Sequence, residues 1–171
     1  KFITNGLDKW YVLTQDVDLG ASTPIQNNGV FFSGGLTGLY NGKVSTIYFQ
    51  QDISDGASLG LFAKTEGAII KNINFNYKLT DLTGIDSISG GLYVGAITGE
   101  AKQSKQNAFQ NINVSISGNV NLELDNNDYA YIGGAVGVNE FIESDNNCLT
   151  NVSVENNLKI NISGNTSNVK M

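Results

Sequence analysis

The chain has 171 residues, a formal net charge of -6 at pH 7 and a pI near 4.4. All 10 of its basic residues are lysine, so it has no arginine, and it also has no histidine. Without these residue types there is no Ser-His-Asp or Cys-His nucleophile system, no His-ligated metal site and no bidentate clamp for phosphate. The acidic charge disfavours nucleic acid as a partner, because proteins bind nucleic acid largely by neutralising its phosphates.

The residues in excess are 20 glycines and 23 asparagines, which are poor in helix interiors and well suited to turns. The length fits one domain, and we expect residues 1–171 to form it as a piece of a larger protein. The single cysteine, Cys148, excludes an intrachain disulfide. No apolar run approaches the roughly 18 residues of a membrane-spanning helix, so we expect no membrane insertion.

Short runs of alternating or continuous apolar residues predict β-strands, and glycine, asparagine, aspartate and serine separate them. In chain order, the predicted strands cover residues 10–13, 43–50, 59–63, 68–77, 92–98, 109–117, 120–124, 129–138, 149–154 and 158–163. No segment keeps a helical period beyond a turn or two. Composition and pattern therefore agree on an all-β fold.

Two motifs recur in the same order along the chain. An asparagine within an apolar run appears at Asn72, Asn111 and Asn151, with spacings of 39 and 40 residues. A glycine-containing apolar run precedes each of them, with reference glycines at Gly60, Gly95 and Gly133, spaced 35 and 38 residues apart. Repeats of this length indicate modules that bury their apolar faces by stacking on one another.

The alternation of apolar and polar residues slips by one position at each of these asparagines. Ile70 shares the parity of Asn72, whereas Ile73 and Phe75 have the opposite parity. Asparagine adopts left-handed backbone conformations more readily than most non-glycine residues, so we place a structural corner between two strands at Asn72, Asn111 and Asn151. Stacked corners of this kind predict a parallel β-helix.

The order of these motifs resembles the GLUG-repeat proteins, a group of bacterial surface β-helix proteins. The opening strand WYVLTQDVDL at residues 10–19 is followed by Gly60-Leu61-Phe62, by Ile70-Lys71-Asn72 and by the glycine-containing run at 93–99, and the resemblance extends to about Val154. GLUG repeats occur in adhesins and in the amino-terminal region of IgA1 metalloproteases. The resemblance implies a right-handed parallel β-helix, or β-solenoid, with short loop excursions, located on the bacterial cell surface or secreted, and it carries over no catalytic residues.

We therefore expect a non-catalytic structural and adhesive domain of a bacterial cell-surface or secreted protein. Its faces, or loops at 81–90, 99–107 and 138–147, would bind a host or neighbouring-cell protein or glycan. Adjacent repeats or domains of the same longer chain are further expected partners. The alternative is an accessory or glycan-binding domain of a secreted protease or carbohydrate-active enzyme. A lyase or hydrolase is disfavoured. β-helix lyases generally use arginine or lysine as the base together with calcium-binding acids, and pectin hydrolases combine aspartates with histidine, whereas this chain has neither arginine nor histidine and its lysines are scattered.

Two acidic stretches contain the oxygen ligands that calcium prefers, at Asp125, Asp128, Glu143 and Asp145. Neither stretch matches an EF-hand loop or the repeat of calcium-binding β-rolls, so we favour solvated turns and no cofactor over a calcium site. Asp16 and Asp18 alternate along one strand and share a face, as a pair of glycosidase carboxylates would. We interpret this pair as structural.

Five aromatic residues are candidates for a strip that stacks on sugar rings, namely Tyr77, Tyr93, Tyr129, Tyr131 and Phe141. Packing within the strands is the interpretation that we favour, and Tyr93 and Tyr131 occupy equivalent positions in the repeat. Cys148 aligns with Ala108, which predicts a small buried hydrophobe rather than a reactive thiol.

Overall fold

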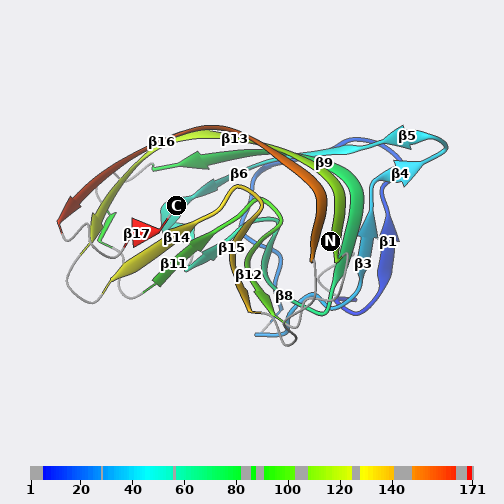
Figure 1. Cartoon of the computed structure of the whole chain (residues 1–171), viewed down its shortest axis with the longest axis horizontal. Coiled ribbons are helices and arrows are strands. Elements are labelled where there is room, and N and C mark those ends of the chain that lie inside the picture. Colours follow the sequence, from blue (N-terminus) through cyan, green and yellow to red (C-terminus); the bar gives the residue numbers. More distant parts are fainter. Residues whose placement is uncertain are drawn as a thin grey trace.

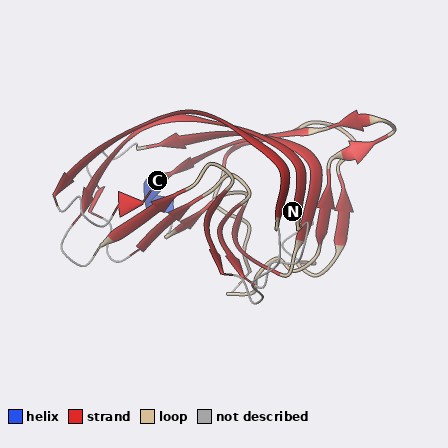
Figure 2. Ribbon diagram, viewed as in Figure 1, coloured by secondary structure: helices blue, strands red, loops and turns tan. Residues whose placement is uncertain are grey.

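The computed structural model describes residues 6–27, 29–55, 57–81, 86–87, 91–102, 108–124, 128–140, 148–164 and 169–170. Within these ranges the chain consists of β-strands and loops, with one short 3-10 helix at Ile53–Asp55 (Figure 2). The strands of the three main sheets pair in parallel. The prediction of an all-β chain with parallel sheets is therefore confirmed.

The strands form sheets of eight, four and three strands, and one small antiparallel hairpin. The eight-stranded sheet contains β1 (Trp10–Val12), β2 (Val17–Ala21), β3 (Gly35–Thr37), β6 (Thr46–Asp52), β9 (Ile69–Thr80), β10 (Asp86–Ser87), β13 (Phe109–Leu124) and β16 (Leu149–Gly164). The four-stranded sheet contains β7 (Ser58–Leu59), β11 (Gly91–Val94), β14 (Tyr129–Ile132) and β17 (Val169–Lys170). The three-stranded sheet contains β8 (Phe62–Glu66), β12 (Thr98–Lys102) and β15 (Val136–Glu140), and the hairpin joins β4 (Leu39–Tyr40) to β5 (Lys43–Val44).

From residue 58 onwards the chain passes through the three parallel sheets three times in the same order. The first module is β7–β8–β9, the middle module is β11–β12–β13, and the last module is β14–β15–β16. Equivalent strands of successive modules pair directly. β9, β13 and β16 lie side by side and arch together over strands of the smaller sheets (Figure 1). Stacked parallel modules thus account for the repeats in the sequence.

The core consists of apolar side chains from neighbouring modules that lie in register. Ile112 of β13 pairs with Ile73 of β9 and with Val152 of β16. Two pairs of stacked aromatic rings extend the core. The ring centroids are 4.1 Å apart in Phe32–Phe62 and 4.5 Å apart in Phe49–Tyr77. Removal of these side chains from water supplies the main driving force for folding.

At the three repeated asparagines the backbone is left-handed, with φ of 52° at Asn72, 54° at Asn111 and 52° at Asn151. Gln110 pairs with Lys71 before the bend, and Ile112 pairs with Ile73 after it, so pairing resumes after a single residue. The sequence places these asparagines between separate strands, whereas in the structure each long strand continues through its bend. The predicted strands 109–117 and 120–124 also merge into β13, because residues 118 and 119 between them belong to the strand, and 149–154 and 158–163 merge into β16 in the same way.

The predicted strands 92–98 and 129–138 are each divided in two. A turn that contains Gly95 links β11 to β12, and a turn that contains Gly133 links β14 to β15. Stacked backbones approach closely at these turns, since a Cβ on Gly95 would lie 2.6 Å from the Gly137 nitrogen. Glycine is required here because the Cβ of any other residue would collide with the backbone of the neighbouring module. The repeated glycines therefore mark where the chain passes from one sheet to the next.

A hairpin replaces the asparagine bend in the turn that precedes the first module. β3 pairs with the beginning of β9 and β6 pairs with its end, so together they occupy the place of one long strand. The hairpin β4–β5 between them projects beyond the arch (Figure 1). Its turn residues Asn41 and Gly42 have φ of 48° and 75°, which is the conformation that two-residue hairpin loops prefer.

Candidate functional site

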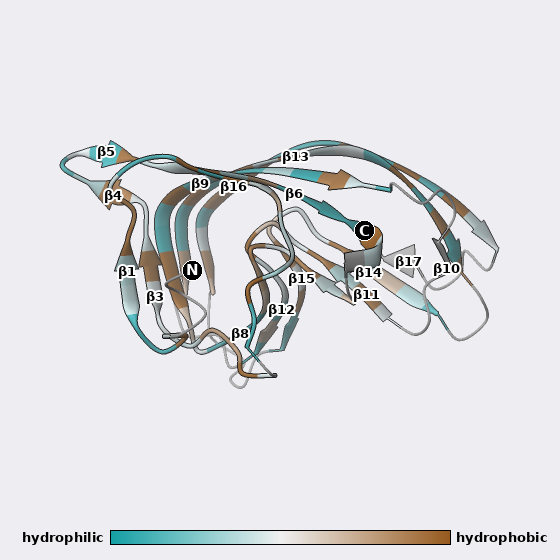
Figure 3. Cartoon of the chain, turned by 180° about the vertical axis from the view of Figure 1, so that it is seen from behind, coloured by the Kyte–Doolittle hydropathy of each residue, from teal (hydrophilic) through white to brown (hydrophobic). Residues whose placement is uncertain are grey.

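Asparagine side chains at the bends form a hydrogen-bonded ladder from module to module. Asn111 Nδ2 donates to Asn72 Oδ1 at 2.9 Å, and Asn151 Nδ2 donates to Asn111 Oδ1 at 2.9 Å. Hydrophilic residues consequently lie next to one another across the bends of β9, β13 and β16 (Figure 3). Each asparagine thus supplies both the bend in its own strand and a polar contact with the neighbouring module.

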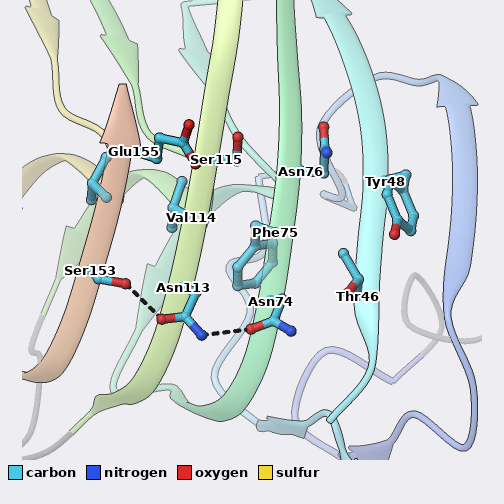
Figure 4. Close-up of a pocket in the computed structure, with 11 residues that line it drawn as sticks. Thr46, Tyr48, Asn74, Phe75, Asn76, Asn113, Val114, Ser115, Ser153 and Glu155 are labelled. Carbon is cyan, nitrogen blue, oxygen red and sulfur yellow. Dashed lines mark hydrogen bonds between the residues drawn. The ribbon is translucent and has the colours of Figure 1, made fainter. Parts of the chain in front are cut away.

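A second ladder lies in a shallow groove of about 350 Å³ on the outer face of the eight-stranded sheet. Asn113 Nδ2 donates to Asn74 Oδ1 at 2.9 Å, and Ser153 Oγ donates to Asn113 Oδ1 at 2.6 Å (Figure 4). Tyr48 and Glu155 stand at opposite sides of this groove (Figure 4). The central polar groups of this groove bond to one another. They therefore mainly hold the modules in register.

A different groove, of about 420 Å³, is lined by strands of both the four-stranded and the three-stranded sheet. We call it the Lys64–Glu100 groove and define it by Ser58 of β7, Lys64 of β8, Tyr93 of β11, Glu100 of β12 and Tyr129 of β14. Parallel pairing of β8 with β12 places Lys64 directly beside Glu100. Five strands from all three modules therefore contribute to it.

An ion pair lines the Lys64–Glu100 groove. Lys64 Nζ is 2.9 Å from Glu100 Oε1, and Ser58 Oγ donates a hydrogen bond to the same oxygen atom. The Glu100 side chain is 12% exposed and the Lys64 side chain 35% exposed, so solvent screens this pair less than a fully exposed one. The Lys64 ammonium also lies 5.6 Å from the centre of the Phe31 ring, as in a cation–π contact. Both charges are thus held in fixed positions.

Three tyrosines cluster beside the ion pair. Tyr93 stacks on Tyr131 with ring centroids 5.6 Å apart and meets Tyr129 edge to face at 5.7 Å. The Tyr93 hydroxyl donates to the Tyr129 hydroxyl at 2.9 Å. This hydrogen bond, burial and the nearby Glu100 carboxylate raise the pKa of Tyr93 above its usual value. Tyr93 therefore stays a neutral hydrogen-bonding group well into the alkaline range.

The Tyr129 ring lies over Gly91 of the neighbouring strand. A Cβ on Gly91 would be only 2.4 Å from a ring carbon of Tyr129, so glycine leaves the space that the ring occupies. Of the five candidates for an aromatic strip, the structure thus brings together Tyr93, Tyr129 and Tyr131. Tyr77 instead lies fully buried in the core, where its hydroxyl donates to Gln51 Oε1 at 3.1 Å. Phe141 lies outside the described residues.

Most of the candidate calcium ligands also lie outside the described residues, namely Asp125, Glu143 and Asp145. Asp128 is described and is buried rather than lying in a solvated turn. Among the residues that the structure describes, no group of three or more His, Cys, Asp or Glu side chains is arranged to hold a metal ion. Much of the predicted loops 81–90, 99–107 and 138–147 falls outside the described ranges as well.

Asp16 and Asp18 each accept a hydrogen bond from the backbone. The Thr46 N–H donates to Asp16 Oδ1 at 2.8 Å, and the Gly20 N–H donates to Asp18 Oδ1 at 2.8 Å. Both carboxylates thereby fix chain geometry around β2. These contacts agree with a structural interpretation of the pair.

Cys148 is buried next to the last module. The Asn139 side-chain amide donates to its sulfur at 3.0 Å. Burial raises the pKa of the Cys148 thiol, and the hydrogen bond from Asn139 opposes this in part. The thiol is therefore protonated near neutral pH and unsuited to nucleophilic chemistry.

Sequence reasoning did not identify Ser58, Lys64 and Glu100 as members of a site. The available signal is that Lys64 and Glu100 each lie shortly after a reference glycine, Gly60 and Gly95 respectively. Opposite charges at equivalent positions of consecutive modules become neighbours once the modules stack in parallel.

Comparison of the chain with protein-family models, with curated proteins and with solved structures finds no match. In the described part of the chain, no helix has the length and apolar character needed to cross a membrane.

Proposed function

We propose that this chain is a non-catalytic structural and attachment domain of a bacterial cell-surface or secreted protein, built as a right-handed parallel β-helix of the GLUG-repeat type. The observation that carries this proposal is the regular stacking of three modules, joined by the ladder through Asn72, Asn111 and Asn151. Stacked modules add along one direction and form a stiff scaffold that presents broad faces to a partner. The partner would be a protein or glycan of a host or neighbouring cell.

A scaffold role without catalysis is supported by how the polar groups are used. The asparagines of the outer face bond to one another, and Asp16 and Asp18 bond to backbone amides. The chain also has no histidine or arginine to provide a base or an oxyanion clamp.

Adjacent repeats or domains of the same longer chain are a second kind of proposed partner. On β16, Leu149 and Val154 are exposed, whereas their paired residues Phe109 and Val114 on β13 are buried. A further parallel strand paired with β16 would cover these side chains.

Attachment is tested with the purified chain immobilised on beads and exposed to host epithelial cells and to bacterial cells. We expect saturable binding that soluble chain competes away. Absence of binding to both kinds of cell, or binding that soluble chain does not compete, would contradict the proposal. Small-angle scattering of the same sample should give an elongated particle, and a spherical one would argue against the β-helix.

The alternative function is an accessory or glycan-binding domain of a secreted protease or carbohydrate-active enzyme. The tyrosine cluster beside the Lys64–Glu100 ion pair favours it, since aromatic rings next to fixed polar groups suit sugar binding. Release of reducing or unsaturated ends from polysaccharides by the purified chain would instead make it an enzyme.

A further inference from the structure

The Lys64–Glu100 groove has unused hydrogen-bonding capacity on its ion pair. Lys64 Nζ and Ser58 Oγ both contact Glu100 Oε1, and no described residue donates to Glu100 Oε2. An ammonium group has three donors, so Lys64 keeps donors for a ligand after pairing with Glu100. A fixed carboxylate oxygen next to a fixed ammonium can bind two adjacent hydroxyl groups, one as donor and the other as acceptor.

The tyrosines add an aromatic surface and a further donor. The Tyr129 hydroxyl accepts from Tyr93, and its own proton has no acceptor among the described residues. Tyr129 is partly exposed, and its ring is held in place by packing over Gly91. An exposed tyrosine ring held in this way offers an apolar face and a polar tip to one ligand. The Gln26 amide and Pro24 also line the groove.

Charge and size narrow the class of ligand. Lys64 and Glu100 are the charged residues that line the groove, and their charges cancel. The whole chain has a net charge of -6, which disfavours phosphate, sulfate and uronate groups. The volume of about 420 Å³ falls within the range of about 300–1,000 Å³ that small-ligand sites occupy. These properties fit a neutral ligand rich in adjacent hydroxyl groups and with an apolar face.

We infer that the Lys64–Glu100 groove binds a neutral carbohydrate, with Glu100 and Lys64 holding adjacent hydroxyl groups and Tyr129 contacting the sugar ring. This inference rests on the proposed attachment function, since it names a ligand class through which attachment would occur. It assigns binding to strands of two adjoining sheets rather than to the loops that the sequence singled out.

The first test applies the purified chain to a glycan array that carries neutral, sialylated and uronic-acid-containing glycans. We expect binding to a subset of neutral glycans and none to their sialylated or uronic-acid counterparts. Selective binding to acidic glycans, or no binding to any neutral glycan, would overturn the inference.

The second test titrates the strongest neutral oligosaccharide from the array into variants of the groove. Tyr129→Ala removes the ring and should raise the dissociation constant at least about tenfold, and Glu100→Gln should raise it by a similar factor. Tyr129→Phe keeps the ring and loses only the hydroxyl, so we expect a smaller increase, of about three- to fivefold. Unchanged affinity in both Tyr129→Ala and Glu100→Gln would overturn the inference.

The control is Tyr48→Ala, which removes an exposed tyrosine from the other groove and should leave the affinity unchanged. Circular dichroism and thermal unfolding establish that each variant is folded. Failure of this inference is separable from failure of the attachment function. If Tyr129→Ala and Glu100→Gln still bind cells while no neutral glycan binds the parent chain, the groove assignment is wrong and attachment stands.

Discussion

The middle and last modules have similar sequence patterns and very different environments. β13 and β16 pair in register along their whole lengths, so that Val114 lies beside Val154. β13 has β9 on its other side, whereas β16 pairs only with β13 among the described strands. Val114 is 3% exposed and Val154 is 44% exposed. Burial in a stack of modules therefore depends on having neighbours on both sides, and the pattern within a strand reports only which face points inward.

The largest expected effect comes from truncating the paired valines. Val114→Ala should lower the free energy of unfolding by about 2–3 kcal/mol, because it removes buried methyl groups and leaves a cavity. Val154→Ala should lower it by about 0.5 kcal/mol or less, as at other exposed positions. Chemical denaturation of both variants measures the difference. Equal losses would mean that β16 is covered in solution, for example by self-association.

The asparagine ladder provides the next comparison. Asn111→Ala should lower the free energy of unfolding by about 2 kcal/mol, because alanine is strained in the left-handed conformation and two ladder hydrogen bonds are lost. Asn151→Ala keeps the same backbone strain and loses one hydrogen bond, so we expect about 1–1.5 kcal/mol. Asn111→Gly separates the two causes, since glycine removes only the side-chain bonds. If Asn111→Gly costs as much as Asn111→Ala, backbone strain is not part of the effect.

Amide hydrogen exchange sharpens the comparison without mutation. Amides of β13 up to Gly118 lie between β9 and β16 and should exchange only on global unfolding. Amides of β16 that point away from β13 should exchange at least about tenfold faster. Nuclear magnetic resonance of the labelled chain measures both sets. Equal protection in β13 and β16 would contradict the assignment of β16 as an edge strand.

The smallest expected effect concerns Cys148, which is buried although it adjoins the edge strand. Its pKa is raised by burial, so the folded chain binds this proton more tightly than the unfolded chain does. The stabilising contribution is complete below the ordinary thiol pKa and is lost as the pH rises through and above that value. Unfolding measured from pH 7 to 10 should show a small alkaline decline that Cys148→Ala reduces, and Tyr93, whose pKa is also raised, accounts for a remainder near the upper end of this range. An identical decline in the variant would attribute it to other groups.

Local pattern predicts the strands well where a single rule governs them. Alternation identifies the inward-facing residues of β9 and β13, and the slip in alternation locates left-handed backbone at Asn72. The same alternation does not reveal that a strand continues through the bend, because continuity depends on hydrogen bonds to the neighbouring module. It also treats 92–98 as one strand, since the turn at Gly95 is imposed by close packing of other modules.

The candidate site is harder to predict than the fold. Tyr93 and Tyr131 are recognisable as equivalent positions in the repeat, and the structure stacks their rings. Tyr77 is also a tyrosine, but it lies in the core, because its position in the alternation of β9 points its side chain inward. The pairing of Lys64 with Glu100 depends on the parallel register of β8 and β12, which no short stretch of sequence encodes.

The sequence by itself determined the all-β class, the module length and the residues at the bends, because these follow from turn propensities and from the period of apolar residues. Only the tertiary structure decided how far each strand runs, which modules are buried, and that a lysine, a glutamate and three tyrosines from strands of two sheets come together. The physical reason is that side-chain neighbours in a stacked sheet come from residues about 35 to 40 positions apart. Their proximity is fixed by backbone pairing between modules, which local sequence does not specify.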